Sequence, residues 1–337
     1  MPPIACVTGA TGFLASELTR QLLQQGWHVQ ATVRSTPRAK FLYALPHAAS
    51  RLKLFEADLL APHSFDECVK DADHVFHTAS PFITSNITDP DLELHRPALE
   101  GTKSIFSAIV KAGIKPRIVL TSSVAAVMGK ATDKPADQCF DEDDWNSTSE
   151  PHGNPPGDGL DIYRYSKLIA EREAWRLAEK HGLEMASICP TFIVGPPVTN
   201  RVDGESLRNM KQALEGELPH RPDTPMIDVR DCAAAHIAAA TVDGAVGQRF
   251  ITSTPRAVAR SQVLQWLTEA YPQYRIHPAD FGQSKGPSRK LFCEKNLHIL
   301  GLKWREPKES LLDMAAAMLD HGVVEPKRSD RKAKGEL

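Results

Sequence analysis

Short runs of apolar and β-branched residues alternate with longer helix-like segments along the first part of the chain. Such runs occupy residues 4–8, 28–33, 52–57, 73–79 and 117–123. Between the first two, Phe13, Leu14, Leu18 and Leu22 recur at about every fourth position and predict an amphipathic helix that ends near Gly26. Strands separated by helices pair in parallel through right-handed crossovers. The pattern therefore predicts an α/β fold, a doubly wound parallel sheet with helices on both faces.

The later segments extend this pattern with one interruption. Residues 182–190 predict a sixth strand, and residues 226–240 predict a short strand or turn that opens an alanine-rich helix. Residues 129–161 are acidic and rich in turn residues, so we expect a surface loop there. Two long helices are expected near 92–112 and 162–181. They would be buried in a monomer or would pack against their copies in a homodimer.

Composition and charge narrow the class of protein. With 337 residues, 42% of them hydrophobic, the chain is long enough to bury a large core. A formal net charge of -2 gives no electrostatic reason to expect nucleic acid or an anionic membrane as a partner. No apolar run approaches the ~20 residues that span a bilayer, and the N-terminus lacks an export signal. We therefore expect a cytoplasmic protein whose partners are small molecules.

The cysteines give no sign of a metal site or a disulfide framework. They are scattered, without a C-x-x-C pair or a close His/Cys spacing. Free cysteines are usually buried and behave as small apolar side chains. We expect reduced thiols and no structural disulfide among Cys6, Cys68, Cys139, Cys189, Cys232 and Cys293.

A glycine-rich turn joins the first predicted strand to the first predicted helix. The sequence VTGATGFLA places Gly9, Gly12 and Ala15 at a G-x-x-G-x-x-A spacing directly after the strand. Gly9 permits a tight turn, Gly12 lets the backbone approach a pyrophosphate, and Ala15 allows close packing of helix on strand. The helix N-terminus then faces the anion. This arrangement predicts a dinucleotide site.

The end of the second predicted strand indicates which dinucleotide binds. Sites that prefer NAD carry an acid there for the ribose 2′-hydroxyl. Here Arg34 and Arg38 follow the strand, and no carboxylate occurs before Glu56. Guanidinium groups suit a 2′-phosphate, so the sequence predicts NADP(H). Asp58 and Leu59 follow the third predicted strand, where Asp58 either flanks the adenine or caps a helix.

Two tyrosines precede one lysine in the segment DIYRYSK. On a helix Tyr163 and Lys167 share a face, whereas Tyr165 points away from the lysine. The pKa of a free phenol is about 10, and a nearby ammonium lowers it towards the working pH of a proton donor. Ser122 and Ser123 close the fifth predicted strand, at the end expected to face the ligand. The tyrosine, the lysine and a serine thus form a candidate catalytic group.

These features resemble the extended short-chain dehydrogenase/reductase family. The chain is most similar to the group of dihydroflavonol reductases, cinnamoyl-CoA reductases and fungal methylglyoxal or ketone reductases. The resemblance rests on segments that occur in family order between Thr8 and His236: TGATGFLA, ATVR, ADL, HVFHTASP, LTSSVAAV, YRYSK, CPTFIVGPP and DVRDCAAAH.

The resemblance implies roles for individual residues. Ser123, rather than Ser122, would orient the carbonyl, Tyr163 would donate the proton, and Lys167 would favour the tyrosinate and bind the nicotinamide ribose. It also implies a Rossmann fold with a smaller C-terminal substrate-binding lobe. The implied NADP(H) contacts are Thr8, Gly9, Gly12, Phe13, Leu14, Arg34, Arg38, Asp58, Leu59, Thr78, Ala79, Ser80, Tyr163, Lys167, Pro190 and Ile193, with no metal.

The α/β rhythm of the chain, and by elimination the segments that lack it, set the expected domain organisation. Residues 1–190, with contributions from about 226–252, would form the NADP-binding domain. Residues 191–225 and 253–325, where the α/β rhythm is less regular, would form the substrate lobe. Residues 326–337 are expected to form a flexible basic tail.

The expected activity is reduction of an aldehyde, a ketone or a dihydroflavonol-like substrate by NADPH. Cinnamoyl-CoA reductases resemble N-W-Y-C-Y-G-K around the tyrosine, whereas this chain has Asp161 and Ile162 ahead of it. The loop between serine and tyrosine is also longer than in plant dihydroflavonol reductases. The substrate therefore stays open. Two alternatives are a nucleotide-sugar epimerase or dehydratase with bound NAD and a non-enzymatic NADP(H)-sensing protein.

Overall fold

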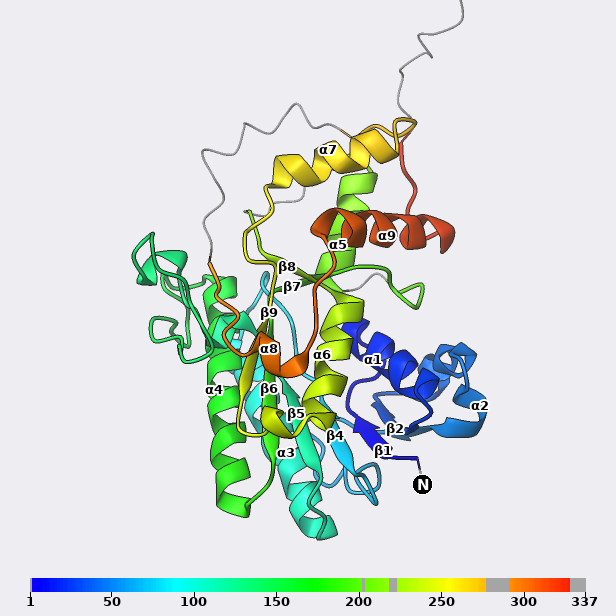
Figure 1. Cartoon of the computed structure of the whole chain (residues 1–337), viewed down its shortest axis with the longest axis vertical. Helices are drawn as coiled ribbons and strands as arrows, with labels where there is room; N and C mark the ends of the chain where they lie inside the picture. The colour runs from blue at the N-terminus through cyan, green and yellow to red at the C-terminus, as the bar shows by residue number, and fades with distance from the viewer. Residues whose placement is uncertain (1, 202–203, 218–222, 277–290, 328–337) are drawn as a thin grey trace, which may run out of the picture.

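A seven-stranded parallel sheet forms the centre of the molecule (Figure 1). The computed structural model describes residues 2–201, 204–217, 223–276 and 291–327. The strand order is β3-β2-β1-β4-β5-β6-β9, so the order reverses beside β1, as in a doubly wound fold. The strands are β1 (Ile4–Val7), β2 (His28–Val33), β3 (Leu52–Glu56), β4 (His74–His77), β5 (Arg117–Thr121), β6 (Met185–Pro190) and β9 (Arg249–Thr252).

Helices cover both faces of this sheet, as expected. On one face α1 (Phe13–Gln24) packs against α6 (Val229–Thr241), and on the other α3 (Arg96–Ala112) packs against α4 (Gly159–His181). Alternate residues of a strand point to opposite faces. Accordingly, Ala5 and Val7 of β1 belong to the core under α1 and α6, whereas Cys6 belongs to the core under α3 and α4. Both faces are apolar because both are covered.

Short elements connect the strands. Gly26, directly after the C-cap of α1, has a φ of 89°, a left-handed conformation that glycine adopts without strain. The connecting helical turns are Pro37–Ala44, α2 (Ala48–Arg51), Asp91–His95, Val124–Ala126, Ala131–Asp133, Asp243–Ala245 and α8 (Leu297–Leu300).

A lobe of separate elements lies beyond the carboxyl edge of the sheet (Figure 1). It contains α5 (Glu205–Leu214), α7 (Arg260–Ala270) and α9 (Pro307–Asp320). A two-stranded parallel sheet of β7 (Phe192–Val194) and β8 (Met226–Asp228) adjoins these helices. The lobe has its own apolar core, formed by side chains of α5, α7, α9 and the small sheet.

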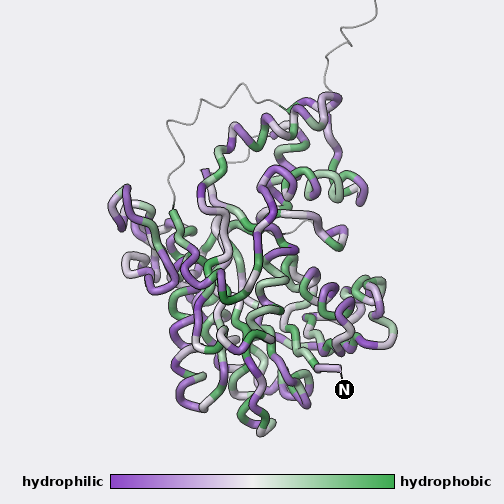
Figure 2. The backbone as a smooth tube through the Cα atoms, viewed as in Figure 1, coloured by the Kyte–Doolittle hydropathy of each residue, from purple (hydrophilic) through white to green (hydrophobic). Residues whose placement is uncertain are grey.

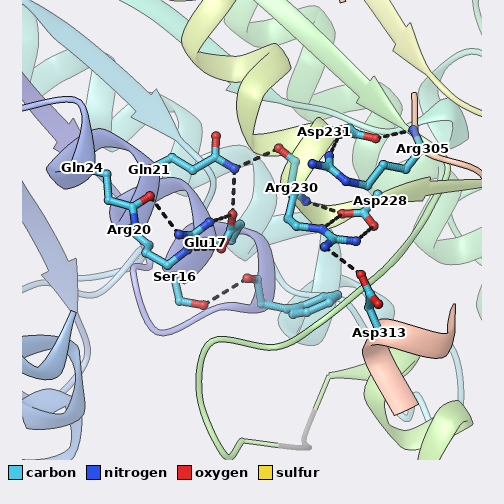
Figure 3. A network of polar contacts seen from close by, with 11 residues as sticks. Ser16, Glu17, Arg20, Gln21, Gln24, Asp228, Arg230, Asp231, Arg305 and Asp313 are labelled. Atoms are coloured by element: carbon cyan, nitrogen blue, oxygen red, sulfur yellow. Dashed lines mark hydrogen bonds and ion pairs between the residues drawn. The ribbon is translucent and has the colours of Figure 1, made fainter. Parts of the chain in front are cut away.

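A network of ion pairs attaches the lobe to the sheet domain (Figure 3). Arg230, in the first turn of α6, binds the carboxylate of Asp228 at 2.7 Å and that of Asp313 in α9 at 2.8 Å. Its backbone carbonyl accepts a hydrogen bond from Gln21 of α1. Asp228 is fully buried and caps α6. Through these contacts Arg230 joins α6, α1 and α9 at one point.

The acidic segment 129–161 differs from the expected surface loop. Its chain is largely hydrophilic (Figure 2), yet Glu142 and Asn146 are buried. The carboxylate of Glu142 accepts hydrogen bonds from the backbone N–H groups of Ile251, Lys295 and Asn296. The Glu142 carboxylate can be buried because backbone donors of β9 and of the segment before α8 satisfy it, while Asn146 forms hydrogen bonds with the backbone of Ala125 and Ser149.

The expectation that all six cysteines are reduced thiols was wrong for two of them. Cys139 and Cys293 form a disulfide across 154 positions of sequence. A parallel bridge between Phe140 and Phe292 lies next to the two cysteines. The Cα atoms of Cys139 and Cys293 are 5.8 Å apart, a separation that a disulfide spans. The other four cysteines are free and buried.

Candidate active site

The turn between β1 and α1 has the backbone that its glycines predicted. Gly9 has a φ of 67° and donates its N–H to Thr32 at 3.0 Å. A Cβ on Gly9 would lie 3.0 Å from the Cβ of Ala79, so even an alanine would be crowded there. Gly12 is the N-cap of α1, and its N–H donates to the carbonyl of Gly9 at 2.9 Å. The turn is therefore held tightly at the N-terminus of a helix, a geometry that suits a pyrophosphate.

Thr8 ties this turn to the end of β4. Its buried Oγ1 accepts the N–H groups of Thr78 and Ala79 at 3.0 Å each, and the Thr78 hydroxyl donates to the Thr8 carbonyl. The Thr8 side chain is thus used within the protein. It shapes the edge on which Thr78, Ala79 and Ser80 lie.

The two arginines predicted to select the cofactor follow β2 and are exposed. Among the described residues, neither Arg34 nor Arg38 forms a side-chain hydrogen bond or an ion pair. The nearby carboxylate of Glu56 is bound by the N–H and the hydroxyl of Thr36, at 2.8 and 2.9 Å. These bonds lower the Glu56 pKa. Both guanidinium groups can therefore turn towards a phosphate.

Asp58 and Leu59 follow β3, and their side chains contact nearby parts of the protein. The Asp58 carboxylate accepts the N–H of Leu60 at 2.9 Å, so it stabilises a turn. The side chain of Leu59 lies over Gly101 of α3, where a Cβ would come within 2.4 Å of it. The leucine thus packs α3 against this corner of the sheet.

Helix α4 places Tyr163 and Lys167 on one face, as their spacing predicted. Tyr163 is buried, and the Lys167 Nζ lies 6.0 Å from the centroid of its ring. The exposed ring of Phe82 packs against Tyr163, with centroids 4.8 Å apart. Tyr165 instead meets His95 edge to face at 5.1 Å. One tyrosine therefore borders the exposed aromatic side chain, while the other packs against a histidine.

Lys167 is buried, and both its burial and neighbouring groups change the pKa of its ammonium group. Burial lowers its pKa to about 8, while Glu171 and Cys189 act in the opposite direction. Among the described residues, its ammonium group forms no hydrogen bond or ion pair. The neighbouring His77 has a pKa of about 3, lowered first by burial and then by Lys167, so it is neutral at physiological pH. The lysine is therefore the positive group of this site, and its N–H groups are available to a ligand.

The two serines after β5 have different surroundings. The Ser122 hydroxyl is buried and donates to the Glu171 carboxylate at 2.6 Å. Ser123 has an extended backbone, and its Oγ accepts the Ala125 N–H at 3.1 Å, which leaves its own proton to donate. Because Ala125 also packs with Tyr163, the more exposed Ser123 lies beside the tyrosine segment.

The remaining candidates surround the same edge. Pro190 ends β6, and Ile193 lies in the middle of β7. Phe13 and Leu14 open α1 and pack into the core beneath it. The structure thus brings Thr78, Ser123 and Pro190 to the carboxyl ends of β4, β5 and β6, neighbouring parallel strands, where doubly wound sheets bind their ligands.

Asp161, where the chain departs from the cinnamoyl-CoA reductase pattern, organises the acidic segment. Its carboxylate accepts hydrogen bonds from the Ser149 hydroxyl at 2.6 Å and from the Asn154 N–H at 2.9 Å. Asp158 caps the same helix through the N–H groups of Leu160 and Asp161. The segment is thereby attached to the start of α4, directly before Tyr163.

A cavity inside the lobe was not expected from the sequence. This lobe cavity, of about 70 Å³, has mostly apolar walls. Phe192 and Val194 of β7 line it, and α5, β8, α7 and α9 supply most of the rest, with Thr224 and Val258 from the adjoining chain. The cavity could not be predicted because its walls come from five separate stretches of chain. The lining residues are Phe192, Val194, Ser206, Asn209, Met210, Ala213, Thr224, Met226, Val258, Arg260, Val263, Leu264, Leu311 and Met314.

The described residues contain no group of three or more His, Cys, Asp or Glu side chains placed to hold a metal ion. No helix within the described ranges is long and apolar enough to cross a bilayer.

The chain is similar to known proteins along most of its length. Residues 5–251 match the NAD dependent epimerase/dehydratase family. Cinnamoyl-CoA reductase 2 of Arabidopsis thaliana is 30% identical over 325 residues, which cover 95% of this chain and 93% of that protein.

Two solved structures have the same overall fold. Yeast methylglyoxal/isovaleraldehyde reductase complexed with NADPH superposes with a TM-score of 0.84 and 28% identity, covering 95% of this chain and 99% of that one. Vestitone reductase from alfalfa (Medicago sativa) gives a TM-score of 0.78 and 28% identity, with the same two coverages.

Proposed function

Because the chain belongs to the NAD dependent epimerase/dehydratase family, we propose that it is an NADPH-dependent carbonyl reductase with Tyr163 as proton donor. The observation that carries the proposal is the pairing of Tyr163 with the buried Lys167 at the carboxyl edge of the sheet. The relatives named above are reductases by name, and the yeast structure contains NADPH.

The residues of the carboxyl edge fit a phosphorylated dinucleotide. Gly9 and Gly12 leave room for a pyrophosphate at the N-terminus of α1, where backbone dipoles favour an anion. Arg34 and Arg38 present two exposed guanidinium groups for the 2′-phosphate. The ammonium of Lys167 would hold the nicotinamide ribose. When bound, the cofactor supplies the hydride.

The chain's own residues would orient the carbonyl oxygen of the substrate and protonate it. Ser123 donates a hydrogen bond to that oxygen and orients it, because its hydroxyl proton is available. Tyr163 donates the proton that completes the alcohol. Lys167 stabilises the tyrosinate left behind, since an ammonium favours a neighbouring anion. Burial of both side chains strengthens this interaction because little water screens it.

The lobe cavity supports a substrate with an apolar body. Its lining is mostly aliphatic, with Phe192 as its aromatic member. The exposed ring of Phe82 against Tyr163 adds an apolar surface beside the proton donor. We propose an aldehyde or ketone that carries an aromatic or branched aliphatic group.

The experiment follows NADPH absorbance over a panel of carbonyls: dihydroflavonols, cinnamoyl-CoA esters, methylglyoxal, aromatic aldehydes and β-keto esters. We expect turnover with at least one apolar carbonyl, and a higher kcat/KM with NADPH than with NADH. Tight NADPH binding without turnover on any member would contradict the reductase and favour a sensing role. A preference for NADH would contradict the assignment of Arg34 and Arg38.

A further inference from the structure

A buried carboxylate lies one helical turn beyond Lys167. Glu171 is fully buried on α4 and accepts hydrogen bonds from Arg249 of β9, from Nε at 2.8 Å and from Nη2 at 3.0 Å. Its second oxygen also accepts the Ser122 hydroxyl at 2.6 Å. One carboxylate thus contacts the loop that carries Ser123 and lies on the helix that carries Tyr163 and Lys167.

The arginine extends this contact to the acidic segment. Arg249 donates to the backbone carbonyls of Glu142 at 3.0 Å and Asp144 at 2.5 Å. Its guanidinium carbon lies 3.9 Å from the centroid of the Trp145 ring. The guanidinium is therefore held from several sides, and it holds the Glu171 carboxylate in one orientation.

The charges around Lys167 single out Glu171. His77 of β4 is neutral above a pKa of about 3, and burial raises the pKa of the Cys189 thiol on β6 to about 12. Burial also opposes ionisation of Glu171, but the charge and hydrogen bonds of Arg249 outweigh it and lower the Glu171 pKa. Among the described groups that face the lysine, Glu171 is therefore the anion, with Arg249 behind it.

We propose that Glu171 is a positioning residue of the reductase site: it fixes Ser122 so that Ser123 faces the substrate, and it holds Lys167 in its charged form. This inference rests on the function proposed above. The geometry of Ser122 supports the first part, because consecutive side chains of an extended segment point to opposite sides and Ser122 is held on the buried side. The spacing of Lys167 and Glu171, one helical turn, supports the second.

The test measures two quantities across pH 6 to 10: kcat, and the dissociation constant of NADPH from protein fluorescence. Lys167 is placed to hold the cofactor ribose, so both quantities should change as it loses its charge near pH 8. Glu171→Gln keeps the shape and an acceptor for Ser122 but removes the charge. The ammonium then loses its stabilising anion, and both midpoints should move to lower pH by roughly one unit.

Three variants separate charge from structure. Glu173→Gln makes the same charge change on the same helix, where the carboxylate is paired with Arg176, and should leave both midpoints unchanged. Ser122→Ala removes the hydrogen bond alone, so it should lower kcat without moving either midpoint. Glu171→Asp keeps the charge and should restore the midpoints towards those of the wild type.

Glu171→Gln leaves Arg249 buried without its carboxylate, and the variant will fold poorly if that cost is large. The double variant Glu171→Gln, Arg249→Met removes both charges and should shift the midpoints in the same direction by a smaller amount. Folded protein of either kind whose midpoints match the wild type would overturn the inference. If the wild type reduces no carbonyl, the proposed function fails, while the NADPH binding curves still decide the role of Glu171.

Discussion

At the carboxyl edge of the sheet the groups that face the expected ligand are polar, whereas the lobe encloses a cavity with mostly apolar walls. The edge is built from turns of fixed conformation, such as the Gly9 turn held against Ala79. The lobe cavity is built from side chains of five elements, and these side chains differ in size and shape. In the function we propose, the edge determines the reaction and the cofactor, while the lobe determines which carbonyl is accepted.

The largest expected effect comes from removing the charge at the edge. Lys167→Met should lower kcat by ~100-fold or more, because proton transfer loses the cation that stabilises the tyrosinate. It should also weaken NADPH binding. Steady-state kinetics and fluorescence titration measure the two effects, and Lys180→Met, an exposed change at the end of the same helix, serves as the control. A Lys167→Met enzyme with near-normal kcat would contradict the role of the carboxyl edge in the reaction.

An intermediate effect is expected from the cofactor-selecting arginine. Arg34→Glu places a negative charge beside the 2′-phosphate and removes a charged hydrogen bond, so the KM for NADPH should rise ~10- to 100-fold. The KM for NADH should change little. Lys53→Glu, an equal charge reversal on β3, is the matched control. An unchanged preference for NADPH would show that Arg34 does not select the cofactor.

The smallest effect is expected in the lobe. Ala213→Leu adds volume to the wall of the cavity and should raise the KM of a bulky carbonyl by roughly fivefold, since overpacking disfavours the larger occupant. The KM of a small aldehyde and the dissociation constant of NADPH should stay constant. Ala316→Leu, exposed on α9, is the control. If both substrates respond equally, the cavity does not hold the part of the substrate that distinguishes them.

Features carried by local sequence were predictable. The glycine turn, six strands of the main sheet and the shared face of Tyr163 and Lys167 each depend on a spacing within a few residues, which a single segment displays. The choice of Ser123 over Ser122 came from family resemblance. The structure adds a physical reason for it, because Glu171 holds the Ser122 hydroxyl.

Features that need distant residues were not predictable. Glu171 meets Arg249 across 78 positions, and the Cys139–Cys293 disulfide joins residues 154 positions apart. Strand β9 was not predicted as a strand; its residues lie within the range of about 226–252 that we expect to contribute to the cofactor domain. No local pattern records these pairings, because the sheet order and the acidic segment bring the partners together.

The most direct test compares the two tyrosines of one helix in a single-turnover reaction with bound NADPH and an accepted carbonyl. Tyr163→Phe should slow NADPH oxidation by ~100-fold or more with little change in NADPH affinity, since it removes the proton donor alone. Tyr165→Phe should remain within about threefold of the wild type, because Tyr165 packs against His95 away from the lysine. Equal rates for both variants, or a fast Tyr163→Phe enzyme, would contradict the assignment of Tyr163 as the proton donor.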